Sequence, residues 1–250
     1  MLIGGLQKIT LIDYPGRLAA TVFLMGCNFR CPFCYNRELV LPAEIKKYPK
    51  IPEKEFFNFL KEKKKFLEGV VLCGGEPTIN KDLPRFCRKI KKLGFLVKLD
   101  TNGSNPEMLK KLINEKLIDY VAMDIKAPLG PNFQFPIPNF QLNSKFQISK
   151  YEKTAGVKVN LEKIKESIEL IKDSGIDYEF RTTIVPTIHT KEDIVEITKD
   201  ISPAKKYFLQ QFRPDKTLDS HYKKCKPFNQ KEMELIQKEC NKYLLTKLRS

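Results

Sequence analysis

The stretch Cys27-Asn28-Phe29-Arg30-Cys31-Pro32-Phe33-Cys34 places three cysteines within a single short loop. It follows an apolar run, residues 19–25, that is typical of a buried strand. Three thiolates are an informative number of ligands, because a structural zinc ion or a fully ligated iron–sulfur cube needs four. Three cysteines on a four-iron cluster would leave one iron open to a small molecule.

Outward from this loop, apolar segments of strand length alternate with segments of helical periodicity. Strands are expected at residues 19–24, 69–73, 95–99, 120–123, 178–184 and 207–211. Helices are expected at residues 52–66, 81–93, 106–115, 161–174, 191–199 and 230–248. This alternation predicts a parallel sheet with right-handed crossovers. Six units are too few for the usual eight-stranded barrel, so we expect an α/β fold, an open (β/α)6 partial TIM barrel.

The whole chain, residues 1–250, is expected to form one domain. Residues 1–17 are interpreted as a lead-in strand or hairpin, and residues 213–250 as a C-terminal tail and helix. Residues 127–156, rich in proline, phenylalanine and asparagine, exceed an ordinary α/β loop and are interpreted as an insertion on the active face. The insertion is either a surface element or a lid or docking element.

Composition narrows the class of protein. With 42% hydrophobic residues, the chain can bury a substantial core. We expect a cytoplasmic protein that does not enter a membrane, because no apolar run approaches the ~20 residues of a membrane span and the N-terminus lacks a signal-peptide pattern. Seven cysteines, three of them clustered, favour metal binding in a reducing compartment over a disulfide framework.

The net charge of +15 has two interpretations. It is either the charge of a lysine-rich surface or a means of steering an acidic partner, such as a small electron carrier. Nucleic acid is not expected as a partner, because no binding motif accompanies the charge.

Polar motifs follow several of the predicted strands, at the ends where parallel α/β sheets carry their sites. They are Gly74-Gly75-Glu76-Pro77, Asp100-Thr101-Asn102-Gly103, Asp124-Ile125-Lys126 and Arg181-Thr182-Thr183-Ile184-Val185-Pro186. With the cysteine spacing and the opening motifs Gly4-Gly5-Leu6-Gln7 and Leu11-Ile12-Asp13-Tyr14-Pro15-Gly16, they resemble the radical S-adenosylmethionine (SAM) superfamily. Within it, the chain is most similar to activating proteins of glycyl-radical enzymes, above all those of anaerobic ribonucleoside-triphosphate reductase. The resemblance runs from about Leu2 to Phe212.

The resemblance implies one [4Fe-4S] cluster, ligated by Cys27, Cys31 and Cys34, and SAM as the second cofactor. It implies reductive cleavage of SAM and removal of a hydrogen from a glycine of a partner glycyl-radical enzyme. Reduced flavodoxin or ferredoxin would supply electrons. The alternative for the cysteines is a zinc site completed by Cys225, His189 or His221.

The resemblance also implies which residues contact SAM. Phe33 and Tyr35 would shield the cluster and contact adenine through the backbone, although Tyr35 stands where the family commonly has histidine. Gly74 and Gly75 permit close approach of a ligand, and Glu76 would neutralise positive charge. Beyond these, polar contacts are expected from Asn102, Asp124, Lys126 and Arg181.

Each of these residues also has a structural alternative: aromatic packing for Phe33, a turn for Asn102, and internal ion pairs for Asp124, Lys126 and Arg181. No catalytic side chain beyond the cluster and SAM is required. His189 is expected in a surface loop, Cys73, Cys87 and Cys240 in the core, and Cys225 exposed.

Two further functions stay open. One is a radical SAM enzyme that acts on a small molecule, for example a ring rearrangement like that of a 7-deazapurine synthase. The other is an iron–sulfur electron-transfer or metal-storage protein without SAM chemistry.

Overall fold

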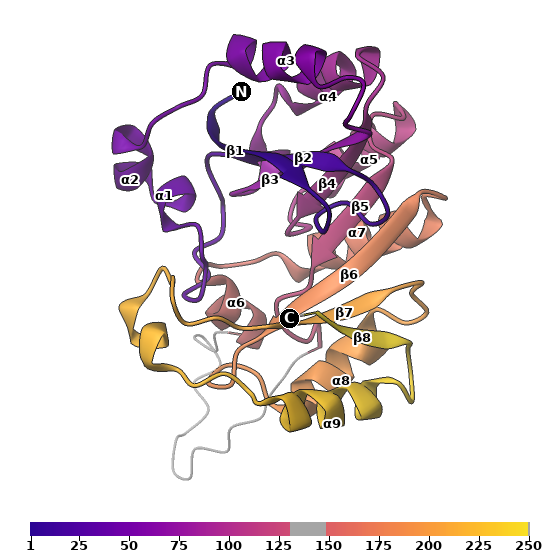
Figure 1. Cartoon of the computed structure of the whole chain (residues 1–250). Coiled ribbons are helices and arrows are strands. Elements are labelled where there is room, and N and C mark those ends of the chain that lie inside the picture. Colours follow the sequence, from indigo (N-terminus) through magenta and orange to yellow (C-terminus); the bar gives the residue numbers. More distant parts are fainter. Residues whose placement is uncertain (131–148, 250) are drawn as a thin grey trace.

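A computed structural model describes residues 1–130 and 149–249. Its centre is one open sheet whose strands lie side by side in chain order (Figure 1). The strands are β1 (Ile3–Thr10), β2 (Ala19–Leu24), β3 (Gly69–Gly74), β4 (Leu96–Thr101), β5 (Tyr120–Asp124), β6 (Asp177–Ile184), β7 (Tyr207–Gln211) and β8 (Thr246–Arg249). β1 is antiparallel to β2, and each following pair is parallel. The predicted open α/β barrel is therefore confirmed, with all six expected strands present.

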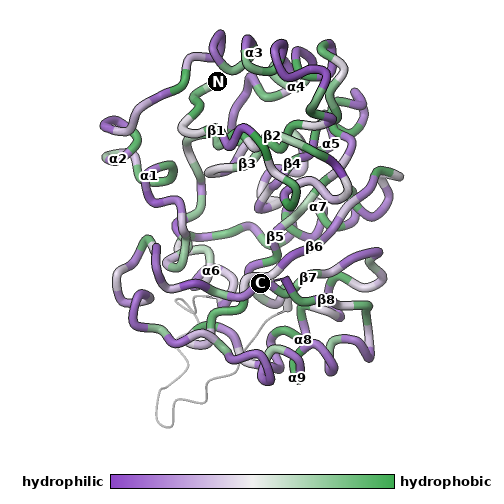
Figure 2. Tube along the Cα trace, viewed as in Figure 1, coloured by the Kyte–Doolittle hydropathy of each residue, from purple (hydrophilic) through white to green (hydrophobic). Residues whose placement is uncertain are grey.

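Helices connect the parallel strands and pack on the outside of the curved sheet (Figure 1). They are α1 (Arg37–Val40), α2 (Pro42–Lys47), α3 (Glu53–Glu62), α4 (Leu83–Lys92), α5 (Pro106–Asn114), α6 (Lys150–Ala155), α7 (Leu161–Asp173), α8 (Lys191–Asp200) and α9 (Gln230–Cys240), with short 3-10 turns η1 (Pro77–Ile79) and η2 (Ser220–Lys224). Buried hydrophobic residues of the strands and of the helices form one large core cluster, and Figure 2 shows hydrophobic residues recurring along both kinds of element.

The prediction for the C-terminus was wrong. The last helix was expected to reach residue 248, but it ends at Cys240, and residues 246–249 form an extra parallel strand beside β7. The chain turns because the Asn241 side chain accepts a hydrogen bond from Thr246 N at 2.7 Å, while Gln237 Nε2 donates to Thr246 O at 2.9 Å. A strand this short carries too little alternation for recognition from sequence.

The inner face of the sheet is unusually polar for a protein core. Along β6, Glu179 and Arg181 alternate with the buried side chains Phe180 and Thr182, so that the charged pair faces inward. The buried Lys98 on β4 belongs to the same inner face, since it contacts Asp100. These charged side chains can bind polar ligands inside the barrel.

The described parts of the expected insertion lie next to the cysteine loop. α6 begins with a capping box at Ser149, and Ala155 O at its end accepts a hydrogen bond from Arg30 N at 2.7 Å. Residues 131–148, which make up most of the expected insertion, lie outside the described residues. No helix in ranges 1–130 and 149–249 is both long enough and apolar enough to cross a membrane.

Candidate active site

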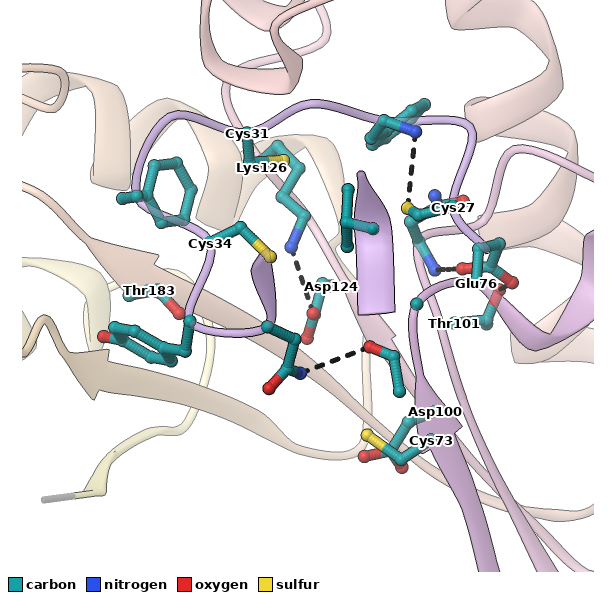
Figure 3. Close-up of a pocket in the computed structure, with 18 of the residues that line it drawn as sticks. Cys27, Cys31, Cys34, Cys73, Glu76, Asp100, Thr101, Asp124, Lys126 and Thr183 are labelled. Atoms are coloured by element: carbon teal, nitrogen blue, oxygen red, sulfur yellow. Dashed lines mark hydrogen bonds and ion pairs between the residues drawn. The ribbon is translucent and has the colours of Figure 1, made fainter. Parts of the chain in front are cut away.

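A cavity of about 170 Å³ opens at the C-terminal ends of the parallel strands (Figure 3). The three cysteines of the loop after β2 line one side of it. Side chains from the ends of β3, β4, β5 and β6 line the other side, namely Cys73, Glu76, Asp100, Thr101, Asn102, Asp124, Lys126, Arg181 and Thr183. The sequence motifs that follow different strands thus meet in one place, as the parallel topology predicts.

The cysteine loop is held in place by main-chain hydrogen bonds. Glu76 N donates to Gly26 O at 2.7 Å, and Arg30 Nη1 donates to Cys27 O at 2.6 Å. Burial raises the pKa of the Cys27 thiol to about 12 and that of Cys31 to about 11. A metal that binds here must displace protons from these buried thiols, because thiolates are the ligating form.

The candidates for a fourth zinc ligand are engaged elsewhere. Both ring nitrogens of His189 bind main-chain groups, His221 is exposed and contacts Asp219, and Cys225 lies 3.9 Å from Thr187 Oγ1. Among the described residues, no three histidine, cysteine or acidic side chains converge on a single-ion position. The available ligands are therefore three cysteines that line one cavity. Three cysteines suit three irons of an iron–sulfur cluster better than a zinc ion, which needs four ligands.

The Gly74-Gly75 pair is packed against the cysteine loop. Gly74 has a φ of +117°, and Gly75 N donates to Leu24 O at 2.8 Å. A Cβ on Gly75 would lie 1.9 Å from Gly26 O, directly before the first cysteine. The absence of a side chain at Gly75 therefore makes room for the loop that carries the cysteines, and both glycines also line the cavity.

Glu76 is buried and accepts four hydrogen bonds. Its Oε1 accepts from Thr78 N at 3.0 Å, from Thr78 Oγ1 at 2.5 Å and from Thr101 Oγ1 at 2.8 Å, and its Oε2 accepts from Asn102 N at 2.6 Å. Burial raises the pKa of this carboxyl group, although the hydrogen bonds oppose the shift. Glu76 therefore joins the ends of β3 and β4 in addition to lining the cavity.

The Asn102 side chain also holds the cysteine loop. Its Nδ2 donates to Asn28 Oδ1 at 3.0 Å, and its Oδ1 accepts from Ser104 Oγ at 2.6 Å. The second N–H of Asn102 Nδ2 can still donate to a ribose or a carboxylate, as expected.

Charged groups cross the floor of the cavity in alternation. Lys126 Nζ contacts Asp124 Oδ2 at 3.0 Å, and Arg181 Nε donates to Asp124 Oδ1 at 2.8 Å. Arg181 Nη1 also contacts Asp100 Oδ2 at 3.0 Å, and the other Asp100 oxygen contacts Lys98. Burial alone would raise the pKa of Asp124, but the Arg181 and Lys126 cations hold it well below its usual range.

With Glu179, which lies 4.0 Å from Arg181 Nη1, three carboxylates face the two lysines and one arginine of this chain of charges. Burial opposes the charged form of Lys126, yet Asp124 and Cys31 raise its pKa, so the ammonium group stays charged. Lys126 and Arg181 can therefore receive a carboxylate at the cavity without a change of protonation.

The aromatic residues of the loop have different surroundings. Phe33 is buried and lines the cavity. Tyr35 lines it too, but its ring stacks on Phe212 with centroids 6.4 Å apart, and its hydroxyl accepts a hydrogen bond from Arg213 N at 2.9 Å. The residue that departs from the family pattern thus connects the cysteine loop to the segment after β7.

The prediction for His189 was wrong: it is 1% exposed, not in a surface loop. Its Nδ1 accepts from Val185 N at 3.0 Å, so Nε2 carries the proton donated to Lys126 O at 2.8 Å. Burial lowers the pKa of this histidine to about 4. The sequence could not predict that His189 bridges two main-chain segments, because both of its partners, Val185 N and Lys126 O, are main-chain atoms.

Several other residues were missed or misplaced by the sequence. Asp100 and Thr183 line the cavity. Cys73, expected in the core, also lines it, whereas Cys87 and Cys240 are buried as expected and Cys225 is partly buried rather than exposed. Position at the end of a strand was the available signal for Asp100, which begins the Asp-Thr-Asn-Gly motif.

Comparisons with known proteins agree with this site. A family model described as the radical SAM superfamily matches residues 21–201. The chain is 35% identical to the "Putative glycyl-radical enzyme activating enzyme" of Methanocaldococcus jannaschii, over 97% of this chain and 93% of that protein. It is also 32% identical to the 7-carboxy-7-deazaguanine synthase of Aquifex aeolicus, but over only 32% of this chain and 34% of that one.

Among solved structures, SuiB of Streptococcus suis bound to S-adenosylmethionine has the same fold, with a TM-score of 0.62 and 15% identity. The match covers 92% of this chain and about half, 52%, of the SuiB chain. Three loop cysteines at the mouth of an open parallel barrel are the arrangement that a [4Fe-4S] cluster and SAM require, and the expectation of these cofactors is confirmed by the family match. The chain belongs to the radical SAM superfamily.

Proposed function

We propose that this chain is an activating enzyme that installs a radical on a glycine of a partner glycyl-radical enzyme, above all an anaerobic ribonucleoside-triphosphate reductase. The observation that carries the proposal is the full-length similarity to a relative named for this activity, which covers 97% of the chain. The sheet does not close into a full barrel, since β1 and β8 are its two edges, and an open barrel suits a protein loop as substrate.

The roles of the chain's own residues follow from their places around the cavity. Cys27, Cys31 and Cys34 would hold three irons, and the open iron would face SAM. When bound, the cluster and SAM supply the electron and the adenosyl carbon that together remove a hydrogen atom from an unactivated carbon. Lys126 and Arg181 would bind the SAM carboxylate.

Other residues would position the nucleotide. Asp124 would accept from a ribose hydroxyl or from the ammonium group, and Phe33 and Tyr35 would shield the cluster from water. Gly74, Gly75, Glu76 and Asn102 keep their proposed place beside SAM, while their contacts also fix the loop. The seven free cysteines favour a reducing compartment, the cytoplasm.

The test is anaerobic incubation of the cluster-loaded protein with dithionite, SAM and candidate glycyl-radical proteins. We expect a glycine-centred radical in electron paramagnetic resonance, formed with the partner and not without it. Cleavage of SAM without any radical on each candidate protein would contradict the proposal. A small-molecule substrate is the second candidate, favoured by the partial match to a 7-deazaguanine synthase. SAM turnover stimulated by purine precursors, and not by proteins, would select it.

A further inference from the structure

The segment between β7 and α9 lies over the cysteine loop, and residues 212–226 are called the strap below. Phe212 stacks on Tyr35, and Asp219 N donates to Pro32 O at 2.8 Å. The Arg213 guanidinium lies 5.6 Å from the centroid of the Tyr35 ring. The strap is therefore attached to the loop at two points, on either side of Cys34.

The outer side of the strap is basic. Its cations are Arg213, Lys216, Lys223, Lys224 and Lys226, all of them exposed. Its acids are Asp215 and Asp219, so five positive and two negative groups leave a formal charge of +3, with His221 neutral. Among the described residues, none of the four lysines forms an ion pair, so their ammonium groups face solvent.

A basin is lined by residues of the strap, by residues of α1 and by Tyr35. Tyr35 lines both this basin and the cavity with the three cysteines. The strap contributes Lys216, Lys223 and Asp215 to this basin, and α1 contributes Arg37 and Glu38. Two lysines of the strap thus share the basin with Tyr35, the residue next to Cys34.

We propose that the strap is the docking surface of an acidic one-electron carrier protein that reduces the cluster. This inference rests on the proposed function, which needs a donor but does not locate it. In the step, one electron leaves the reduced carrier, which is oxidised, and enters the cluster, which is reduced. The exposed amines are spread over the strap rather than gathered in a buried pocket, so they suit a broad acidic surface better than a small anion.

The strap favours a carrier over nucleic acid. No nucleic-acid-binding motif accompanies the cations of the strap. Weak, electrostatically steered contacts of small area are typical of redox complexes.

The test compares two triple variants with equal charge changes. K216E/K223E/K224E alters the strap, and K63E/K64E/K65E alters exposed lysines after α3; each lowers the net charge from +15 to +9, two units per change. Reduction of the cluster by photoreduced acidic flavodoxin is followed by stopped flow, and affinity for oxidised flavodoxin by calorimetry. A [4Fe-4S] ferredoxin serves as a second carrier probe.

We expect the strap variant to lose about tenfold or more in second-order rate and in affinity at low salt, with a smaller change in the control. The difference should disappear near 0.5 M salt, where screening is strong. Equal rates and affinities for the two variants with both carriers would overturn the proposal. A loss of oligonucleotide binding without a loss of carrier binding would overturn it in favour of nucleic acid.

Photoreduced deazaflavin, a small mediator, separates this inference from the proposed function. It should drive SAM cleavage equally in the unaltered protein and in both variants, because the strap lysines lie outside the cavity. Absence of SAM cleavage in the unaltered protein would count against the proposed function. Normal deazaflavin-driven cleavage combined with unchanged carrier kinetics would count against the strap alone.

Discussion

His189 does not line the cavity, yet its side chain helps to hold a residue that does. It joins the main chain after β6 to the carbonyl of Lys126, the residue that ends the Asp124-Ile125-Lys126 motif. Because Val185 N occupies Nδ1, the fold requires the neutral imidazole. Protonation would replace an acceptor with a donor that faces another donor.

This arrangement predicts a pH dependence of stability. The folded pKa, about 4, is lower than the unfolded value near 6.5, so the unfolded state binds more protons between these pH values. Stability should therefore fall as pH falls through this window, by about 2 kcal/mol from this group between pH 7 and pH 5. Urea unfolding at both pH values measures the effect. His189→Gln should flatten the dependence; a slope unchanged in that variant would contradict this account.

Gly75 sets the distance between β3 and the cysteine loop. Gly75→Ala should lower the iron bound per chain by more than half after anaerobic reconstitution, because its methyl group would overlap Gly26 O. Gly130→Ala is the matched control, since a Cβ there meets no atom of residues 1–130 or 149–249 within 4 Å. Iron content and visible absorption measure the outcome, with far-ultraviolet circular dichroism as a check of folding. Normal iron loading in Gly75→Ala would mean that the loop can shift freely.

At the scale of elements, β8 is the seventh parallel strand of the sheet, and it also carries the guanidinium group of Arg249. Arg249 donates to both oxygens of the buried Glu179, at 2.8 and 3.1 Å. Tyr120 also donates to Glu179, at 3.1 Å. Glu179 in turn lies 4.0 Å from the Arg181 guanidinium, so the C-terminal strand reaches the charges of the cavity through one carboxylate.

Arg249→Ala should destabilise the protein by about 1–3 kcal/mol, because a buried carboxylate loses its bidentate partner. Lys247→Ala, at an exposed position of the same strand, should cost less than about 0.5 kcal/mol. Denaturant unfolding of both variants gives the difference. Equal midpoints would show that Glu179 needs no support from β8.

The elements also explain which predictions succeeded. Strands followed by glycine-rich or acidic motifs were predictable, because apolar runs and strand-end chemistry are local patterns. The contacts of Asn102 with Asn28, 74 residues apart, and of Tyr35 with Arg213, 178 residues apart, were not, because they depend on how the strands assemble. β8 escaped detection because its residues read as the continuation of an amphipathic helix.

At the scale of the whole molecule, the fold brings the cysteine loop to the C-terminal ends of the parallel strands. Main-chain bonds from Gly75 and Glu76, the Asn28–Asn102 pair and the strap fix the loop from three sides. The sheet provides Asp124, Lys126 and Arg181 opposite the thiols. The central claim is that three cysteines hold a cluster whose fourth iron is open to SAM.

Mössbauer spectroscopy of the ⁵⁷Fe-reconstituted protein tests this claim most directly. The account predicts a four-iron cluster in which one iron changes its parameters on addition of SAM, while the three cysteine-ligated irons do not. Cys27→Ala, Cys31→Ala and Cys34→Ala should each abolish the cluster signal. A single iron-binding site, or four irons that are all indifferent to SAM, would contradict the account.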